Sequence, residues 1–169
     1  MRGRSWDITR LRTNQKWVYL YLYVVMDIYS RAVVGWMVAT SETAELASRL
    51  IEETCAKQGV TPGTLVLHAD RGTQMTSKTL AQLLSDLEVV NSHSRPQVSN
   101  DNPFSESQFK TMKYHSSFPG KFATLDDATT FCRADRATAG RQRPARLRRD
   151  RRDVRQLLDC RRPRLCDDP

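Results

Sequence analysis

The chain has 169 residues, of which 39% are apolar and 27% are charged. This length suits one globular domain, and the composition excludes collagen-like and wholly disordered proteins. The longest apolar run, residues 17–26, is about half of the roughly 20 residues that a membrane-spanning helix needs, and no secretory leader is evident. We therefore expect a cytoplasmic protein with no membrane partner.

The net charge of +8 is distributed unevenly along the chain. Residues 133–169 contain thirteen arginines and six aspartates, whereas residues 1–132 are nearly neutral. Every aromatic residue lies at or before Phe131, so the C-terminal tail has no large side chains from which to build a core. We predict a folded domain over residues 5–132, followed by a disordered, Arg-rich tail over residues 133–169.

The first part of the domain has the composition of strands. Residues 6–11, 17–28 and 32–40 are rich in Val, Tyr and Leu, and they predict an antiparallel meander. Apolar residues then recur with helical spacing over residues 41–57, where Ser41 or Thr43 is the candidate N-cap.

The rest of the domain alternates between strands and helices. Its pattern predicts a strand over 64–68, a helix over 77–87, a short strand over 89–93 and a loop over 94–101. Asn102 and Pro103 then mark the start of a helix to about Tyr114, and a last helix begins at Asp126. This order indicates an α/β fold with a mixed five-stranded sheet flanked by helices.

Three acidic residues occupy positions suited to a metal site. Asp7 lies in the first strand, Asp70 directly follows the fourth, and Glu106 lies about one turn into the helix that begins at Pro103. Hard divalent cations prefer oxygen ligands, and two such ions can hold the attacking and leaving oxygens of a phosphoryl transfer. By spacing alone this signal is weak, because thirteen acids in residues 1–132 make many such triples and most acids are simply solvated.

The residues around these acids resemble a known family. The segments are WDIT (6–9), LYVVMDIYSR (22–31) with VGW (34–36), HADRG (68–72), and SNDNPFSES (99–107) with FKTMK (109–113). Together they resemble the integrase catalytic core of bacterial insertion-sequence (DDE) transposases, which is similar to retroviral integrases. The 35 residues between Asp70 and Glu106 match the usual interval of that family.

The resemblance implies a ribonuclease H-like fold and a metal-dependent polynucleotidyl transferase that cleaves and joins DNA strands. It implies that Asp7, Asp70 and Glu106 are the catalytic residues and bind two Mg²⁺ or Mn²⁺ ions. The implied partners are DNA, as transposon ends and target, and further copies of the chain in a homo-oligomer. Asp27 also matches a family motif, but its place at a strand end favours a structural role.

Two lysines follow Glu106 on the same helical face. Lys110 and Lys113 lie four and seven residues after it, so they fall one and two turns further along. An ordinary Glu–Lys pair on a solvated helix would give the same spacing. The resemblance implies instead that both lysines contact DNA.

The sequence also departs from the family. Complete members carry a helix-turn-helix segment before the core and a further helix after it, and we expect this core to be truncated at its C-terminal end. Residues 133–169 contain no Lys, Glu or aromatic residue, as an out-of-frame reading of GC-rich codons would produce. Two alternatives to an active enzyme therefore remain. The first is a catalytically inactive transposase remnant that at most binds nucleic acid. The second is a nucleic-acid-binding protein that acts through its basic tail.

Overall fold

The computed structural model describes residues 2–69, 78–93 and 103–141. The predicted strands and helices of these residues are all present, with ends shifted by a few positions. In chain order the elements are β1 (Arg2–Arg12), β2 (Tyr19–Asp27), β3 (Val33–Ala39), α1 (Ala44–Lys57), β4 (Leu65–Ala69), α2 (Lys78–Asp86), β5 (Val90–His93), α3 (Pro103–Lys113) and α4 (Leu125–Arg141).

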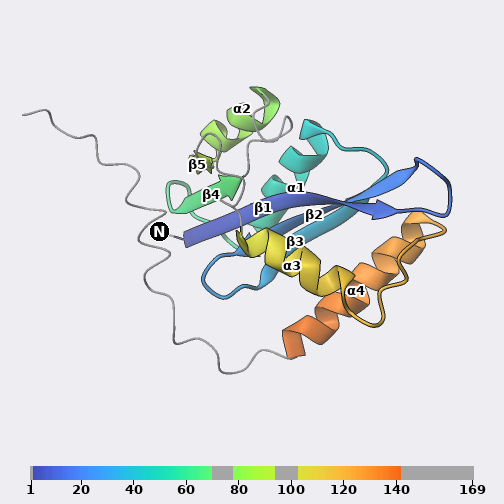
Figure 1. Ribbon diagram of the computed structural model, residues 1–169. Helices are drawn as coiled ribbons and strands as arrows, with labels where there is room; N and C mark the ends of the chain where they lie inside the picture. The colour runs from blue at the N-terminus through green and yellow to red at the C-terminus, as the bar shows by residue number, and fades with distance from the viewer. Residues whose placement is uncertain (1, 70–77, 94–102, 142–169) are drawn as a thin grey trace, which may run out of the picture.

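The strands form one mixed sheet in the order β3-β2-β1-β4-β5. The meander β1-β2-β3 is antiparallel, whereas β4 pairs in parallel with both β1 and β5. Helices cover both faces of the sheet (Figure 1), as the continuous apolar runs of the strands predict. The α/β architecture expected from the sequence is therefore confirmed.

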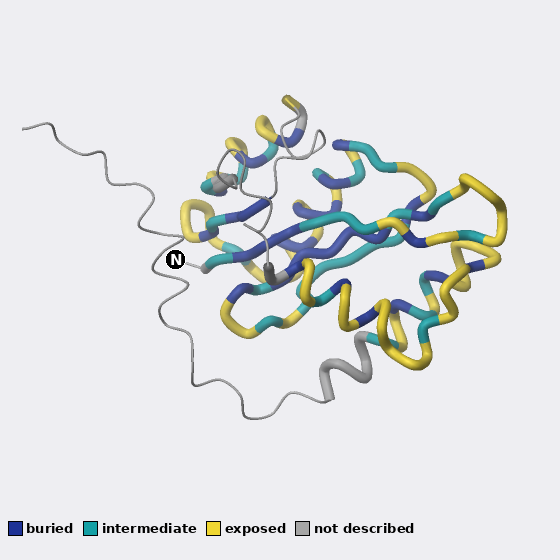
Figure 2. Tube along the Cα trace, viewed as in Figure 1, coloured by how far each residue is buried: buried dark blue, intermediate teal, exposed yellow. Residues whose placement is uncertain are grey.

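Each face of the sheet has its own apolar core. Trp6 and Tyr23 lie on the face covered by α1 and α2, together with Leu50 and Leu84 from those helices. Leu22 and Phe109 belong to the opposite face, which α3 and α4 cover. Figure 2 shows the buried positions concentrated in the central strands, with exposed positions on the outer sides of the helices.

Helix α1 is fixed closely against the sheet. The Thr43 hydroxyl accepts a hydrogen bond from the Leu46 backbone N–H at 3.3 Å, which confirms Thr43 as the N-cap. The Tyr23 hydroxyl accepts from the Thr43 backbone N–H at 2.9 Å and so links β2 to the start of α1. Further along, Gly35 of β3 leaves room for Thr54 of α1, which a Cβ at position 35 would meet.

The last helix extends beyond the predicted domain end. Helix α4 continues through residues 133–141, so this part of the tail is helical, and the prediction of disorder is wrong for it. The physical reason is local: Ala and Arg are strong helix formers that need no apolar core to favour a helix. Predictions for residues 142–169 lie outside the described residues. No helix in the described ranges is long and apolar enough to cross a membrane.

Candidate active site

A row of polar side chains lies on one face of the central strand. Successive side chains of a strand point to opposite faces. Trp6 belongs to the α1/α2 core, so Ser5, Asp7 and Thr9 lie on the face that α3 covers. Asp7 is partly buried, and its Oδ1 accepts a hydrogen bond from the Ile8 backbone N–H at 2.8 Å. One face of β1 is thus polar where the other is apolar.

Helix α3 is attached to this row on both sides of Asp7. The hydroxyls of Ser5 and Ser105 are 3.0 Å apart in a hydrogen bond, and both residues are buried. At the other end of the helix, Lys113 Nζ donates to Thr9 Oγ1 at 2.7 Å. These two contacts fix how far α3 lies along β1. They therefore fix where the helix holds Glu106 relative to Asp7.

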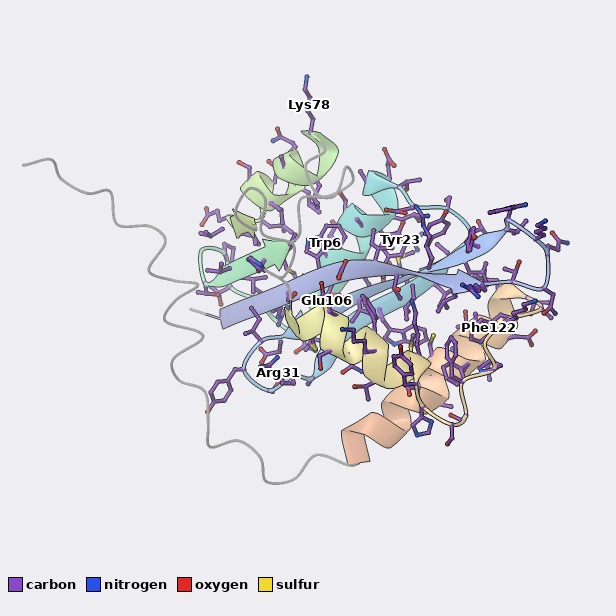
Figure 3. The ribbon with its side chains drawn as sticks, in the orientation of Figure 1. Trp6, Tyr23, Arg31, Lys78, Glu106 and Phe122 are labelled. Carbon is purple, nitrogen blue, oxygen red and sulfur yellow. The ribbon has the colours of Figure 1, made fainter. Side chains whose placement is uncertain are left out.

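Glu106 lies on the flank of α3 that faces away from α4. At 3.6 residues per turn, Glu106 and Lys113 project from one flank, whereas Gln108 projects from the other. Gln108 lines a cavity with residues of α4, and Lys113 reaches β1. Glu106 is exposed, and Figure 3 labels it on the opposite side of the β1 ribbon from Trp6. Its carboxylate is thus available on the same side of the sheet as Asp7.

The strand pairing brings the end of β4 beside Asp7. Trp6 pairs with Ala69, the last residue of β4, so Asp7 is one position beyond that pair. Asp70 follows Ala69 in the sequence but lies outside the described residues, as does the predicted loop over 94–101. Within the described ranges, no three His, Cys, Asp or Glu side chains form a group that could hold a metal ion. Asp7 and Glu106 supply carboxylate oxygens, which are the donors that Mg²⁺ and Mn²⁺ accept.

The two lysines of α3 differ in their surroundings. Lys110 is exposed, as a residue that contacts a large ligand needs to be. Lys113 is exposed as well, but partial burial of the Lys113 ammonium, with a smaller contribution from the nearby positive charge of Arg12, lowers the pKa of Lys113 below its ordinary value. Lys113 already donates to Thr9, so it helps to hold α3 in place as well as adding charge to this flank.

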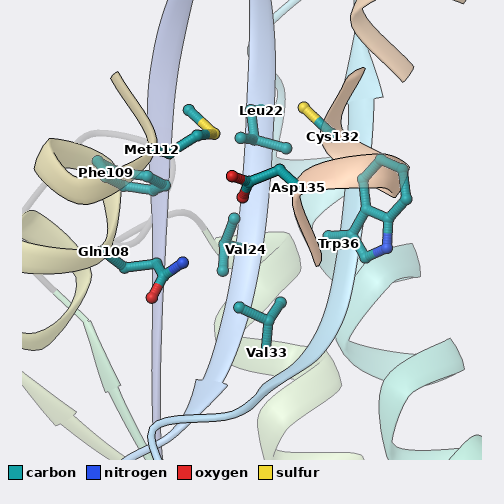
Figure 4. A pocket seen from close by; sticks show the side chains of 9 residues that line it. All are labelled: Leu22, Val24, Val33, Trp36, Gln108, Phe109, Met112, Cys132 and Asp135. Carbon is teal, nitrogen blue, oxygen red and sulfur yellow. The ribbon is translucent and has the colours of Figure 1, made fainter. Parts of the chain in front are cut away.

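The cavity is separate from the carboxylates. It lies between the sheet, α3 and α4 (Figure 4), on the Gln108 flank of α3 rather than on the Glu106 flank. The Asp135 carboxylate is its charged group, and burial raises the pKa of that carboxyl. The lining is otherwise mainly apolar, with Leu22, Val24, Val33, Trp36, Phe109, Met112 and Cys132.

Asp27 has the structural surroundings that the sequence indicated. Its Oδ1 accepts hydrogen bonds from the backbone N–H and the hydroxyl of Ser30, at 2.7 and 2.9 Å. Its backbone carbonyl accepts from the Arg31 N–H at 2.9 Å. Asp27 therefore closes the turn between β2 and β3.

Ser5, Thr9 and Ser105 are site residues that were not predicted from the sequence. The first two alternate with apolar residues around Asp7, and this period of two was a usable signal for a strand with one polar face. Ser105 gave no such signal, because a serine near the start of a helix is common on exposed helices. Only the pairing of Ser5 with Ser105 identifies the role of the two serines.

Comparisons of the sequence with known proteins all indicate one family. The sequence model of the integrase core domain matches residues 3–99. The chain is 34% identical over 123 residues to the transposase for insertion sequence element IS904 of Lactococcus lactis. It is 36% identical over 107 residues to transposase InsF for insertion sequence IS3A of Escherichia coli. These matches cover 73% and 63% of this chain, but only 47% and 36% of the two transposases, so the chain spans less than half of either relative.

Solved structures show the same fold. The catalytic core domain of BIV integrase has a TM-score of 0.53 at 19% identity, and the match covers 75% of this chain and 78% of that one. An intasome chain of simian T-cell lymphotropic virus has a TM-score of 0.59 at 14% identity, with 76% and 46% of the two chains covered. The HTLV-2 integrase catalytic core domain in complex with magnesium has a TM-score of 0.52 at 16% identity, with 66% of each chain covered. From its sequence match and its fold together, the chain belongs to the integrase core domain family.

Proposed function

We propose that this chain is the catalytic core of a DNA transposase, a metal-dependent polynucleotidyl transferase that cleaves DNA strands and transfers them to a target. The single observation that carries this proposal is the attachment of α3 to β1 on both sides of Asp7, through Ser5–Ser105 and Thr9–Lys113. These contacts hold Glu106 on the same side of the sheet as Asp7. The transposase relatives support the type of reaction.

The proposed metal ligands are Asp7, Asp70 and Glu106, which would hold two Mg²⁺ or Mn²⁺ ions. Their carboxylates fit hard cations by donor type. When bound, such ions would activate the nucleophile and stabilise the leaving oxygen of a phosphodiester. The HTLV-2 integrase core was solved in complex with magnesium, which supports this choice of metal.

The proposed partners are DNA and further copies of the chain. Lys110 and Lys113 lie on the same flank of α3 as Glu106, so they would meet the phosphates of a strand that reaches the carboxylates. Contacts of this kind add affinity with little regard to sequence. The intasome of simian T-cell lymphotropic virus and the dimeric form of the HTLV-2 core support a homo-oligomer that joins two DNA ends.

Metal-dependent cleavage of supercoiled plasmid DNA by the purified full chain tests this function. We expect nicking with Mn²⁺ or Mg²⁺ and none with EDTA. Asp7→Asn and Glu106→Gln should each reduce the rate by about 100-fold or more, because each removes an interaction needed in the transition state. Glu52→Gln, which changes an exposed acid of α1, is the matched control and should cleave like the wild type.

A binding measurement separates the metal site from the reaction. Calorimetric titration with Mn²⁺ should show binding to the wild type and to Glu52→Gln, and much weaker binding to Asp7→Asn. Equal cleavage and equal Mn²⁺ binding by Asp7→Asn would remove Asp7 from the site. A folded wild type that binds Mn²⁺ and DNA but cleaves nothing would favour the inactive remnant.

A further inference from the structure

Two segments distant in sequence form a single surface at one end of the molecule. The hairpin between β1 and β2 pairs with the connection between α3 and α4 through an isolated bridge from Thr13 to Phe122. The Asn14 backbone N–H donates to the Phe122 carbonyl at 3.1 Å, and the Phe122 N–H donates to the Arg12 carbonyl at 3.0 Å. In Figure 1 the hairpin tip lies beside the start of α4. We call residues 12–17 and 113–122 the hairpin–loop surface.

The hairpin–loop surface carries positive charge only. The two segments contain four Lys and Arg residues and no Asp or Glu: Arg12, Lys16, Lys113 and Lys121. The neighbouring Arg10 lies on the other face of β1, where its Nη2 is 3.9 Å from Glu42 Oε2. Asp127, at the start of α4, instead accepts a hydrogen bond from the Thr124 backbone N–H at 3.1 Å. A polyanion would therefore meet this surface with favourable charge complementarity.

The same surface presents the two most exposed large apolar side chains recorded in the described residues. Tyr114 is 87% exposed and Trp17 is 77% exposed. Trp17 has a φ of 67°, a left-handed conformation that is uncommon for a bulky residue. Lys16 Nζ lies 5.5 Å from the centre of the Trp17 ring. The chain thus holds an indole in solvent at a strained position, which needs a reason beyond packing.

Hydrogen bonds and buried aromatic rings fix the two segments of the hairpin–loop surface. The Thr13 hydroxyl donates to the carbonyl of Val18 at 2.8 Å, which closes the hairpin around Trp17. Phe122 is buried, and its ring lies 5.8 Å from that of Phe118 and 5.7 Å from that of Phe131. The segments that carry the exposed aromatic rings are therefore already ordered. Binding a ligand to these rings costs little conformational entropy in those segments.

We propose that the hairpin–loop surface binds a DNA strand with unpaired bases, with cations on its phosphates and with Trp17 and Tyr114 stacked on its bases. Nonspecific binders of single strands combine a positive surface with exposed aromatic side chains, because every base has a face that can stack. Cations alone would serve a duplex equally well, whereas the exposed rings favour unpaired bases. The inference extends the proposed function, since Lys113 joins this surface to the Glu106 flank of α3, but the binding itself requires no metal and no cleavage.

Fluorescence anisotropy with a labelled twenty-nucleotide oligo(dT) and a duplex of equal length tests the proposal, using the full chain in EDTA. We expect the wild type to prefer the single strand. Trp17→Ala and Tyr114→Ala should each weaken oligo(dT) binding by about tenfold and change duplex binding much less, because each removes stacking on about one base. Trp17→Tyr should keep most of the wild-type affinity for oligo(dT). Trp17→Leu should not, because leucine is apolar but cannot stack on a base.

Two controls separate this surface from other sources of affinity. Tyr29→Ala removes an aromatic ring that is 66% exposed in the turn between β2 and β3, and it should bind oligo(dT) like the wild type. Lys16→Ala with Lys121→Ala should flatten the salt dependence of binding, and Lys57→Ala with Lys78→Ala should do so less. The Arg-rich tail is present in every variant, so it contributes equally to all of them.

Oligo(dT) affinities of Trp17→Ala and Tyr114→Ala equal to that of the wild type would overturn the proposal. Equal losses of affinity for the single strand and for the duplex would overturn it as well. So would a change in the sedimentation coefficient of either variant without a change in its DNA affinity, because the rings would then act in self-association. Asp7→Asn should bind oligo(dT) normally, so loss of cleavage and loss of strand binding are distinguishable. Circular dichroism of each variant confirms that it folds.

Discussion

The two faces of β1 show how one strand serves both stability and chemistry. On the α1/α2 side, Trp6 is completely buried in an apolar core. On the opposite side, the next residue is Asp7, which lies between the polar contacts Ser5–Ser105 and Thr9–Lys113. The first face is stabilised mainly by apolar area removed from water, and the second by a few hydrogen bonds whose positions matter. Substitutions on the two faces should therefore affect different measurements.

The strongest test of this difference replaces neighbouring residues of β1. Trp6→Ala should lower the free energy of unfolding by about 3–5 kcal/mol, because it deletes a large buried side chain and leaves a cavity. Asp7→Asn should abolish cleavage while changing the free energy of unfolding by less than about 1 kcal/mol. Urea denaturation and plasmid nicking measure the two effects. If Asp7→Asn were as unstable as Trp6→Ala, its loss of activity would not identify a catalytic role.

A second test examines the close approach of α1 to the sheet. A Cβ at Gly35 would lie 3.0 Å from both Cβ and Cγ2 of Thr54 and would meet its hydroxyl. Gly35→Ala should therefore cost about 1–3 kcal/mol in the free energy of unfolding, since helix or strand must shift. Gly3→Ala is the matched control, because its Cβ would make an ordinary 3.5 Å contact with Ile28. Equal free energies of unfolding for the two variants would show that α1 can shift away from β3 without loss of stability.

The hydrogen bond between the two serines provides a smaller effect. Ser105→Ala removes the hydroxyl that pairs with Ser5 in a buried setting, and should cost about 1–2 kcal/mol in stability. The nicking rate should also fall, because α3 is then less firmly placed beside Asp7. A double-mutant cycle with Ser5→Ala measures the coupling. Additive effects of the two substitutions would show that the pair does not act as a unit.

The smallest expected effect concerns the cavity beside α4. Burial raises the pKa of Asp135 above its ordinary 3.8, and the charge of nearby His115 opposes the rise. The folded chain therefore binds this proton more tightly than the unfolded chain. Consequently, the stabilisation present at low pH is lost as pH rises through the raised pKa.

Asp135→Asn should remove this part of the pH dependence and stabilise the protein slightly near neutral pH, because the amide carries no charge. Urea denaturation from about pH 4 to about pH 7 checks the slope. The control is Asp126→Asn, which removes the same charge from the exposed first turn of α4, outside the cavity. The same slope in Asp135→Asn and the wild type would contradict the assignment.

The sequence by itself determined the order of the elements and the candidate carboxylates. Continuous apolar runs marked the strands of the meander, and helical spacing of apolar residues marked α1 and α2. Ser41 or Thr43 marked the start of α1, and Pro103 marked the start of α3. Asp27 was separated from the catalytic candidates by its place at a strand end, and its hydrogen bonds to Ser30 agree with a structural role. These features are local, because a few neighbouring residues determine the backbone conformation of each.

Only the tertiary structure decided which distant residues meet. No local pattern indicates that Ser105 binds Ser5, that Lys113 binds Thr9, or that the turn before Trp17 pairs with the connection around Phe122. The prediction from sequence was also wrong for residues 133–141. Their lack of large apolar side chains indicated disorder, whereas their Ala and Arg content favours the helix that forms the end of α4. Such contacts depend on strand order and on how each helix packs across the sheet, which are properties of the whole chain rather than of any short segment.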